Sequence, residues 1–419
     1  MEFNDEENMK NESAGRFNSV SFTWGIISGM VFIAVAFAVI LFFKTDLLGA
    51  AFSPKNPEAK SSGMAVEEKL EHIFRLLDKN YVNEYDKAEN IEDMYRGLIY
   101  SLGDPYTTYF TPDQYDKFME ETSGTYAGIG VSVSVSAEDN SIVIIVPFEG
   151  YPGARAGLMP GDRIIKVNDT DVTGDMLDYA VSIMKGTPGT SVNVTFWRES
   201  DNSTFEREII RETINVPTVS HKMLDDNIGY LRITQFDRVT YDQFMDAYKD
   251  LKFQNMTGLV LDLRNNPGGL LNIVSSITDE LVPQGLIVYT EDKNGKKEYS
   301  RSNAKAIDIP LVVLVNGNSA SASEVLSGAV KDHGVGKIVG TTTYGKALVQ
   351  NIFPLPDGSA LKITIAKYYT PNGTLIQGEG ITPDYEIEMS DELSMQISSL
   401  TLDEDVQLQK AVDVIKGLE

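Results

Sequence analysis

Three serines follow an apolar segment, and one of them could act as a nucleophile. Leu311–Val315 is entirely aliphatic and predicts a buried strand, which leads through Ser319, Ser321 and Ser323 into an expected helix over residues 325–331. A hydroxyl at such a junction is exposed beside a helix N-terminus, whose partial positive charge stabilises a developing oxyanion. The pattern is equally typical of serines that only cap a helix.

A serine nucleophile needs a neighbour that accepts its proton. Of the three histidines, neither His221 nor His333 lies in a recognisable catalytic-triad context. Lys346 is an alternative, because a lysine desolvated among apolar groups loses its preference for the charged form and can serve as the base. Two plainer interpretations stay open: Lys346 as an exposed residue beside a turn, and Gln350 as an ordinary strand residue.

The segment around Lys346 also matches most of a nucleotide-binding P-loop. Gly340 and Gly345 have the required spacing, but Ala347 stands where magnesium coordination needs a Ser or Thr hydroxyl. Residues 348–353 predict a strand and not the helix that a P-loop begins. Nucleotide binding is therefore disfavoured.

Composition excludes several classes of function. The 419 residues carry 36 Lys+Arg and 61 Asp+Glu, a net charge of −25, so the surface repels nucleic-acid phosphates, and no basic cluster counters this. There is no cysteine, and the three histidines are scattered. We expect no nucleic-acid partner, no metal site and no cofactor.

An uncharged run near the N-terminus predicts a membrane span. Residues 17–43 contain no charged side chain, more than the roughly 20 residues that a bilayer crossing needs. The leader is mostly acidic, which favours an uncleaved anchor over a signal peptide, although residues 49–51 could form a cleavage site. Lysine and arginine lie on both sides, so charge leaves the orientation open.

Residues 45–63 are rich in Ala, Ser, Pro and Gly and predict a flexible stalk. Beyond this stalk, the spacing of the apolar residues changes from the period of helices to that of strands. Residues 66–80 and 91–102 have the period of helices and predict a helical hairpin. From residue 128 the period becomes two, with expected strands at 131–135, 142–146 and 192–196, which indicates a small, mostly antiparallel domain.

This second region resembles a PDZ domain. The likeness rests on Gly161-Asp-Arg-Ile-Ile-Lys-Val-Asn168 and a helix over residues 176–185, preceded by the loop Tyr126-Ala-Gly-Ile-Gly-Val131. In such a domain the amides of Ile129, Gly130 and Val131 would bind a terminal carboxylate, and the adjoining strand would offer an edge to the peptide. The alternative is a small β-domain with glycine-rich turns that binds nothing.

The segment from Asn227 to about Glu388 alternates buried strands with helical stretches, which indicates an α/β core. A strand over residues 257–263 runs into Arg264-Asn-Asn-Pro-Gly-Gly269, a turn whose free amides can face a ligand.

Several motifs in one order resemble the C-terminal processing peptidases, the tail-specific serine proteases. They are Asn-Ser-Ala-Ser321-Ala-Ser-Glu324 followed 25 residues later by Lys346 and then Gln350, together with Gly103-Asp-Pro105, Leu261-Asp-Leu-Arg-Asn-Asn-Pro-Gly-Gly269 and Gln377-Gly-Glu-Gly-Ile-Thr-Pro-Asp384. The likeness covers nearly the whole chain after the stalk.

The resemblance implies a role for each matching residue. Ser321 would be the nucleophile, Lys346 the general base and Gln350 the residue that orients the lysine. The amides of Ala322 and of Gly268 or Gly269 would form the oxyanion hole. Glu324 would support the site. The family often has glycine where this chain has Ala347, and contact between Gln350 and Lys346 requires a bend near Gly345.

The expected fold is a multidomain α+β and α/β chain with a transmembrane helix, a helical hairpin, a PDZ β-domain and an α/β serine protease core. The expected boundaries are tail 1–19, transmembrane helix 20–43, linker 44–64, helical region 65–114, PDZ domain 115–212, protease core 213–390 and C-terminal helical segment 391–419.

The leading hypothesis is a membrane-anchored serine endopeptidase that acts on proteins or peptides with a free C-terminus. The resemblance implies a body on the extracytoplasmic side and makes the helices of residues 66–102 a candidate homodimer element. The alternatives are a catalytically idle PDZ scaffold and a P-loop nucleotide-binding protein.

Overall fold

The structure is a computed structural model that describes residues 64–303 and 306–417. The described residues divide into two units, with the boundary between residues 87 and 88. Among the residues described, none of the helices combines the length and apolar character needed to cross a membrane. The span predicted over residues 20–43 lies outside the described residues, as do the predicted tail and residues 44–63 of the linker.

The predicted N-terminal helices are present as α2 (Val66–Asn80) and α3 (Lys87–Tyr100). A short strand β1 (Thr108–Phe110) and a further helix α4 (Pro112–Ser123) follow. Thr111 and Gln114 form a capping box at the start of α4, because each side chain accepts a hydrogen bond from the other's backbone N–H. The helix ends at Gly124, whose φ of 65° suits glycine.

The PDZ region is an antiparallel sheet in the order β3-β4-β5-β7-β8, with β6 paired to β5. Alternate residues such as Ile142, Ile144, Val192 and Val194 are buried, as the period of two predicts. The elements are β2 (Thr125–Gly128), β3 (Val131–Val135), β4 (Ile142–Pro147), α5 (Pro152–Arg155), β5 (Arg163–Val167), β6 (Thr170–Asp171), η1 (Gly174–Met176), α6 (Leu177–Met184), β7 (Ser191–Arg198), β8 (Ser203–Ile210) and β9 (Glu212–Asn215).

The region predicted as the protease core contains a six-stranded sheet in the order β10-β11-β12-β15-β16-β19. All neighbours are parallel except β10 and β11, which confirms the predicted α/β core. The strands are β10 (Val219–Met223), β11 (Ile228–Ile233), β12 (Gly258–Asp262), β15 (Leu311–Val315), β16 (Lys337–Gly340) and β19 (Tyr385–Glu386).

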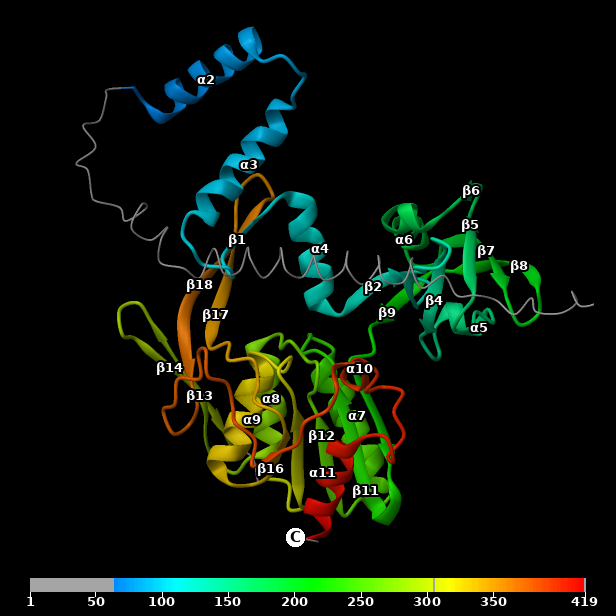
Figure 1. The fold of residues 1–419 in the computed structure, drawn as a ribbon, viewed down its shortest axis with the longest axis vertical. Coiled ribbons are helices and arrows are strands. Elements are labelled where there is room, and N and C mark those ends of the chain that lie inside the picture. Colours follow the sequence, from blue (N-terminus) through cyan, green and yellow to red (C-terminus); the bar gives the residue numbers. More distant parts are fainter. Residues whose placement is uncertain (1–63, 304–305, 418–419) are drawn as a thin grey trace, which may run out of the picture. The chain divides into compact units, whose positions relative to one another are not determined.

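Helices cover both faces of this sheet. Leu259, Leu261 and Leu263 belong to a core with residues of α7 (Thr240–Phe253), α8 (Leu271–Leu281) and α9 (Ala322–His333). Val260 points to the opposite face, where it packs with Leu408 and Val412 of α11 (Val406–Lys416). Figure 1 shows α11 in red near β12 and β16. Coverage of both faces explains why these strands read as continuous aliphatic runs.

A second sheet has the order β1-β18-β13-β14, with β17 also paired to β18. Its register shifts between Val349 and Gln350, so the strand that follows Lys346 is irregular near the predicted site. The remaining elements are β13 (Gly285–Asp292), β14 (Lys297–Ser302), β17 (Leu348–Pro354), β18 (Ala360–Tyr369), η2 (Asp225–Asn227) and α10 (Asp391–Met395).

Candidate active site

The parallel pairing of β12 with β15 brings two loops to one edge of the sheet. Both strands end at the same edge, so residues 264–269 and 316–321 emerge side by side. The Asn265 amide donates to Asn316 Oδ1 over 3.0 Å, and Asn316 Nδ2 donates back to Asn265 Oδ1 over 2.8 Å. Side-chain amides therefore fix one loop to the other.

The three serines at this edge have different environments. Ser319 and Ser323 are fully buried, and their hydroxyls donate to the carbonyls of Leu263 and Asn266 over 2.8 and 2.9 Å. Ser321 is partly exposed and lines a cavity of about 450 Å³. Two of the three hydroxyls are thus occupied in holding the loops together.

Ser321 has a strained backbone. Its φ of 53° and ψ of −110° are rare for a residue with a side chain, and such strain costs about 1–3 kcal/mol. The residue immediately precedes α9. Its N–H donates to Glu324 Oε2 over 2.8 Å, and its carbonyl accepts from the Tyr368 hydroxyl over 2.9 Å. The surroundings therefore hold this serine at the helix N-terminus.

The Glu324 carboxylate links α9 to the loop that carries Lys346. Besides the Ser321 amide, it accepts from Thr343 Oγ1 (2.6 Å) and from the amides of Gly345 (2.7 Å) and Lys346 (2.9 Å). Burial raises the pKa of Glu324, and these hydrogen bonds oppose that shift. Glu324 thus fixes the backbone positions of Ser321 and Lys346 relative to each other.

The predicted oxyanion amides lie around Ser321. A Cβ on Gly268 would lie 2.8 Å from the Ala320 carbonyl oxygen and 2.9 Å from Ser321 Cβ, so only glycine fits there. The Gly268 amide donates to Asn266 Oδ1 over 2.8 Å. In the described part of the chain, the amides of Gly269 and Ala322 make no hydrogen bond, so both are free to donate to an oxyanion.

Lys346 has a fixed backbone and a half-buried side chain. Its carbonyl accepts a hydrogen bond from the Tyr368 hydroxyl, and its Nζ lies 4.5 Å from the centroid of the Tyr106 ring. Burial and the nearby Lys362 lower the pKa of Lys346, while Asp104 and Glu324 raise it, and the net direction is downward. Lys346 lines the same cavity as Ser321, but no described hydrogen bond joins their side chains.

Gln350 lines this cavity too, yet its side chain is bound elsewhere. Its Nε2 donates to Thr364 Oγ1 over 3.4 Å, and no described hydrogen bond joins it to Lys346. The chain turns at Gly345, whose φ is 86°. Leu348–Pro354 then forms a strand, so the helix of a P-loop is absent after Lys346, as the sequence predicts.

The predicted peptide-binding loop borders a separate cavity of about 270 Å³, whose lining includes Ile129, Val131, Phe148, Val181 and Met184. Gly130 has a φ of 75°, which turns the loop between β2 and β3. The Tyr126 hydroxyl lies within reach of the Gly130 and Val131 amides, and burial raises its pKa to about 12. A neutral hydroxyl therefore lies where a peptide carboxylate would be expected to bind.

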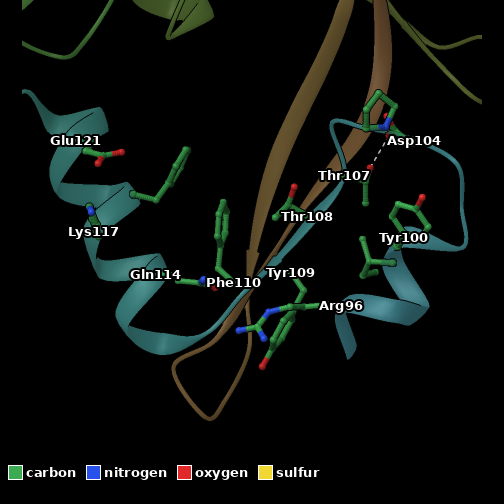
Figure 2. A pocket seen from close by; sticks show the side chains of 13 residues that line it. Arg96, Tyr100, Asp104, Thr107, Thr108, Tyr109, Phe110, Gln114, Lys117 and Glu121 are labelled. Carbon is green, nitrogen blue, oxygen red and sulfur yellow. Dashed lines mark hydrogen bonds between the residues drawn. The ribbon is translucent and has the colours of Figure 1, made fainter. Parts of the chain in front are cut away.

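A larger hollow of about 710 Å³ lies between α3, β1 and α4, and Ser321 and Lys346 are not among its lining residues. Figure 2 shows Phe110 and Lys117 on its walls. Phe118 contributes to both this hollow and the Ser321 cavity.

Sequence reasoning gave no role to a buried ion network behind the Gly268 loop. Arg264, which is fully buried, donates to Asp262 Oδ2 over 2.6 Å and to Asp405 Oδ2 over 2.7 Å. Burial raises the pKa of Asp262, but the Arg264 guanidinium outweighs this and holds it below its usual value. The sequence does contain a signal for this network, because Asp262 and Arg264 carry opposite charges two positions apart at the end of an aliphatic strand.

Comparison with known proteins gives three family matches along the chain. Residues 227–387 match peptidase family S41, residues 144–198 match a PDZ domain, and residues 21–114 match the activating protease CtpB N-terminal domain.

Three relatives cover most of the chain. The carboxy-terminal-processing protease of Bartonella bacilliformis is 38% identical over 75% of this chain and 74% of its own length. The carboxyl-terminal-processing protease of Synechocystis is 32% identical over 88% and 92%. The carboxy-terminal processing protease CtpA of Bacillus subtilis is 34% identical over 86% and 78%. A serine-type site on an α/β core with a PDZ domain, at these identities, places the chain in peptidase family S41, among the carboxy-terminal processing proteases.

Proposed function

We propose that this protein is a membrane-anchored endopeptidase that binds the free C-terminus of a substrate in its PDZ groove and cleaves with a Ser321–Lys346 pair. One observation carries the proposal: a strained serine at a helix N-terminus shares a cavity with a half-buried lysine whose pKa is lowered. Burial of this kind is how a lysine becomes a base near neutral pH.

In the first half of the reaction, Ser321 Oγ attacks the scissile carbonyl carbon and its proton passes to neutral Lys346 Nζ. The carbonyl oxygen becomes an oxyanion, which the free amides of Ala322 and Gly269 stabilise together with the N-terminus of α9. The tetrahedral intermediate collapses, the peptide C–N bond breaks, and Lys346 returns its proton to the leaving amine.

In the second half, water attacks the acyl-enzyme ester and gives a proton to Lys346. The new oxyanion binds to the same amides. Collapse releases a carboxylic acid product, and Ser321 recovers its proton from Lys346. Gln350 orients the lysine amine in this cycle, for which it must exchange its hydrogen bond to Thr364.

Substrate selection belongs to the PDZ groove. The terminal carboxylate accepts hydrogen bonds from the amides of Gly130 and Val131, near the Tyr126 ring, and the apolar wall accepts the last side chain. Residues 20–43 anchor the chain, and the catalytic body lies on the extracytoplasmic side. The helices of residues 66–102 are a candidate homodimer element.

The deciding experiment measures hydrolysis of an unstructured fluorescent peptide with a free C-terminus by the full-length chain. Ser321→Ala and Lys346→Arg should both lose activity, by roughly 10⁴-fold or more, because a guanidinium cannot deprotonate in a protein. Ser276→Ala, at an exposed serine of α8, is the matched control for removing a hydroxyl.

Wild-type activity should fall as pH decreases and Lys346 takes up its proton. Full activity in Ser321→Ala would show that another residue is the nucleophile. Absence of hydrolysis by the wild-type chain, with peptide binding intact, would instead indicate a PDZ scaffold.

A further inference from the structure

The segment between α3 and β1 places an anion and an aromatic ring beside Lys346. The Asp104 carboxylate accepts hydrogen bonds from the Tyr106 amide (3.0 Å) and from Thr107 Oγ1 (2.6 Å), so its position is fixed. Figure 2 shows the Asp104–Thr107 bond. The Thr364 amide donates to Thr107 Oγ1 over 3.1 Å, which ties the segment to β18.

The Lys346 side chain points to this segment. Its Nζ lies 4.5 Å from the centroid of the Tyr106 ring, a geometry that favours an ammonium over a neutral amine, because the ring face attracts positive charge. Gln350, expected to orient Lys346 for catalysis, is also held here through Thr364. Among the described residues, the side chains of Lys346 and Gln350 thus contact this segment or its partner strand, and neither is hydrogen-bonded to Ser321.

We propose that Asp104 and Tyr106 form a resting site for the Lys346 ammonium, which Lys346 must leave before it can take the proton of Ser321. This inference rests on the proposed function. The backbone of Lys346 is anchored by Glu324 and Tyr368, so rotation within the side chain alone separates the two positions. On leaving, Lys346 gives its extra proton to water and becomes a neutral base.

Other charged and titratable groups also face Lys346. Lys362 from β18 opposes its charge, while Glu324 from α9 and Asp104 favour it. Burial and a hydrogen bond to Tyr344 raise the pKa of Tyr106, so that phenol stays neutral. Removing the Asp104 charge therefore removes one of the two groups that keep Lys346 protonated.

The test compares pH profiles of kcat/KM for the full-length chain on the unstructured peptide. Asp104→Asn removes the charge and keeps one oxygen to accept from the Tyr106 amide, while its NH2 group replaces the oxygen that accepts from Thr107. This substitution should move the acidic limb of the kcat/KM profile to lower pH. At pH values below the midpoint of the wild-type limb, it should raise kcat/KM several-fold. The control Asp116→Asn changes an exposed aspartate of α4 and should leave the profile unmoved.

Two substitutions of Tyr106 test the role of its aromatic ring. Tyr106→Leu removes the aromatic face and should shift the limb in the same direction, whereas Tyr106→Phe keeps the face and should behave as wild type. A merely structural role predicts lower rates at every pH with an unmoved midpoint. That outcome, or equal effects of Leu and Phe, overturns the resting site.

A second readout does not need turnover. The pH at which an amine-directed acylating reagent labels Lys346, followed by mass spectrometry, should fall in Asp104→Asn. If Lys346→Arg stays active, the proposed function fails while the labelling can still support the resting site. If labelling is unchanged but Lys346→Arg is inactive, the resting site alone fails.

Discussion

In the proposed function the PDZ groove and the protease cavity both bind peptide chains, but different groups line them. Apart from Lys185, the residues around the PDZ groove carry no charge. The protease cavity has Lys346, Lys362, Arg238 and Asp237 in its wall, and burial raises the pKa of Asp237 to about 6. Tail binding should therefore vary little with pH, while cleavage should vary strongly. Substitutions of buried charges should separate the two activities.

The largest effect is expected from Arg264→Leu, which leaves Asp262 and Asp405 buried without their cation. Breaking a buried ion pair in this way costs about 3–5 kcal/mol, so the free energy of unfolding of the protease core should fall by that amount. Urea unfolding measures it. The matched control is Arg163→Leu in the PDZ domain, because its partners Asp139 and Glu199 are exposed. An equal loss in both variants would contradict the comparison.

The pH dependence of this network has a definite sign. Arg264 holds the pKa of Asp262 below its ordinary value of 3.8, so the stabilisation is fully present above that pH and is lost as pH falls through the lower folded-state value. The difference in the free energy of unfolding between wild type and Arg264→Leu should therefore become smaller in strong acid. A difference that grows on acidification would show that Asp262 is not the partner that matters.

A smaller effect is expected from Glu324→Gln, a positioning change. The amide cannot accept all four hydrogen bonds, so the Lys346 loop shifts relative to Ser321 and kcat should fall roughly 100-fold, with KM little changed. Glu67→Gln on α2 is an exposed control. Loss of peptide affinity together with kcat would point to general misfolding.

The smallest effect is expected at the PDZ groove. Amidating the C-terminus of a peptide removes one charged acceptor, which should weaken binding about tenfold. Fluorescence anisotropy with free-acid and amide peptides measures this. Without residues 124–212 the preference for a free C-terminus should disappear. Equal affinity of the intact chain for both peptides would refute tail recognition.

Sequence patterns predicted most of the scaffold, because strands covered on both faces must be aliphatic and half-buried strands must alternate. Helix α4 was missed, although Thr111, Pro112 and Gln114 form a readable start signal. Ser321 could be singled out by resemblance alone. The structure adds a physical reason: the hydroxyls of Ser319 and Ser323 are bonded to loop carbonyls.

The orientation of the Lys346 side chain could not be predicted. The Lys346 amine lies beside the Tyr106 ring, which is far away in sequence and is held there by the pairing of β1 with β18 and by the Thr364–Thr107 hydrogen bond. The four hydrogen bonds accepted by the Glu324 carboxylate could not be predicted either, because a glutamate three residues into a helix is first interpreted as a capping residue.

The Arg264–Asp405 pair has a consequence for biosynthesis. Its two residues are separated by 141 positions, so Arg264 leaves the ribosome long before its second carboxylate is made. Until α11 docks on the sheet, Arg264 behind the loop that carries Gly268 and Gly269 has only the Asp262 carboxylate as its partner. A nascent chain, or one truncated before Asp405, should thus be a poor protease.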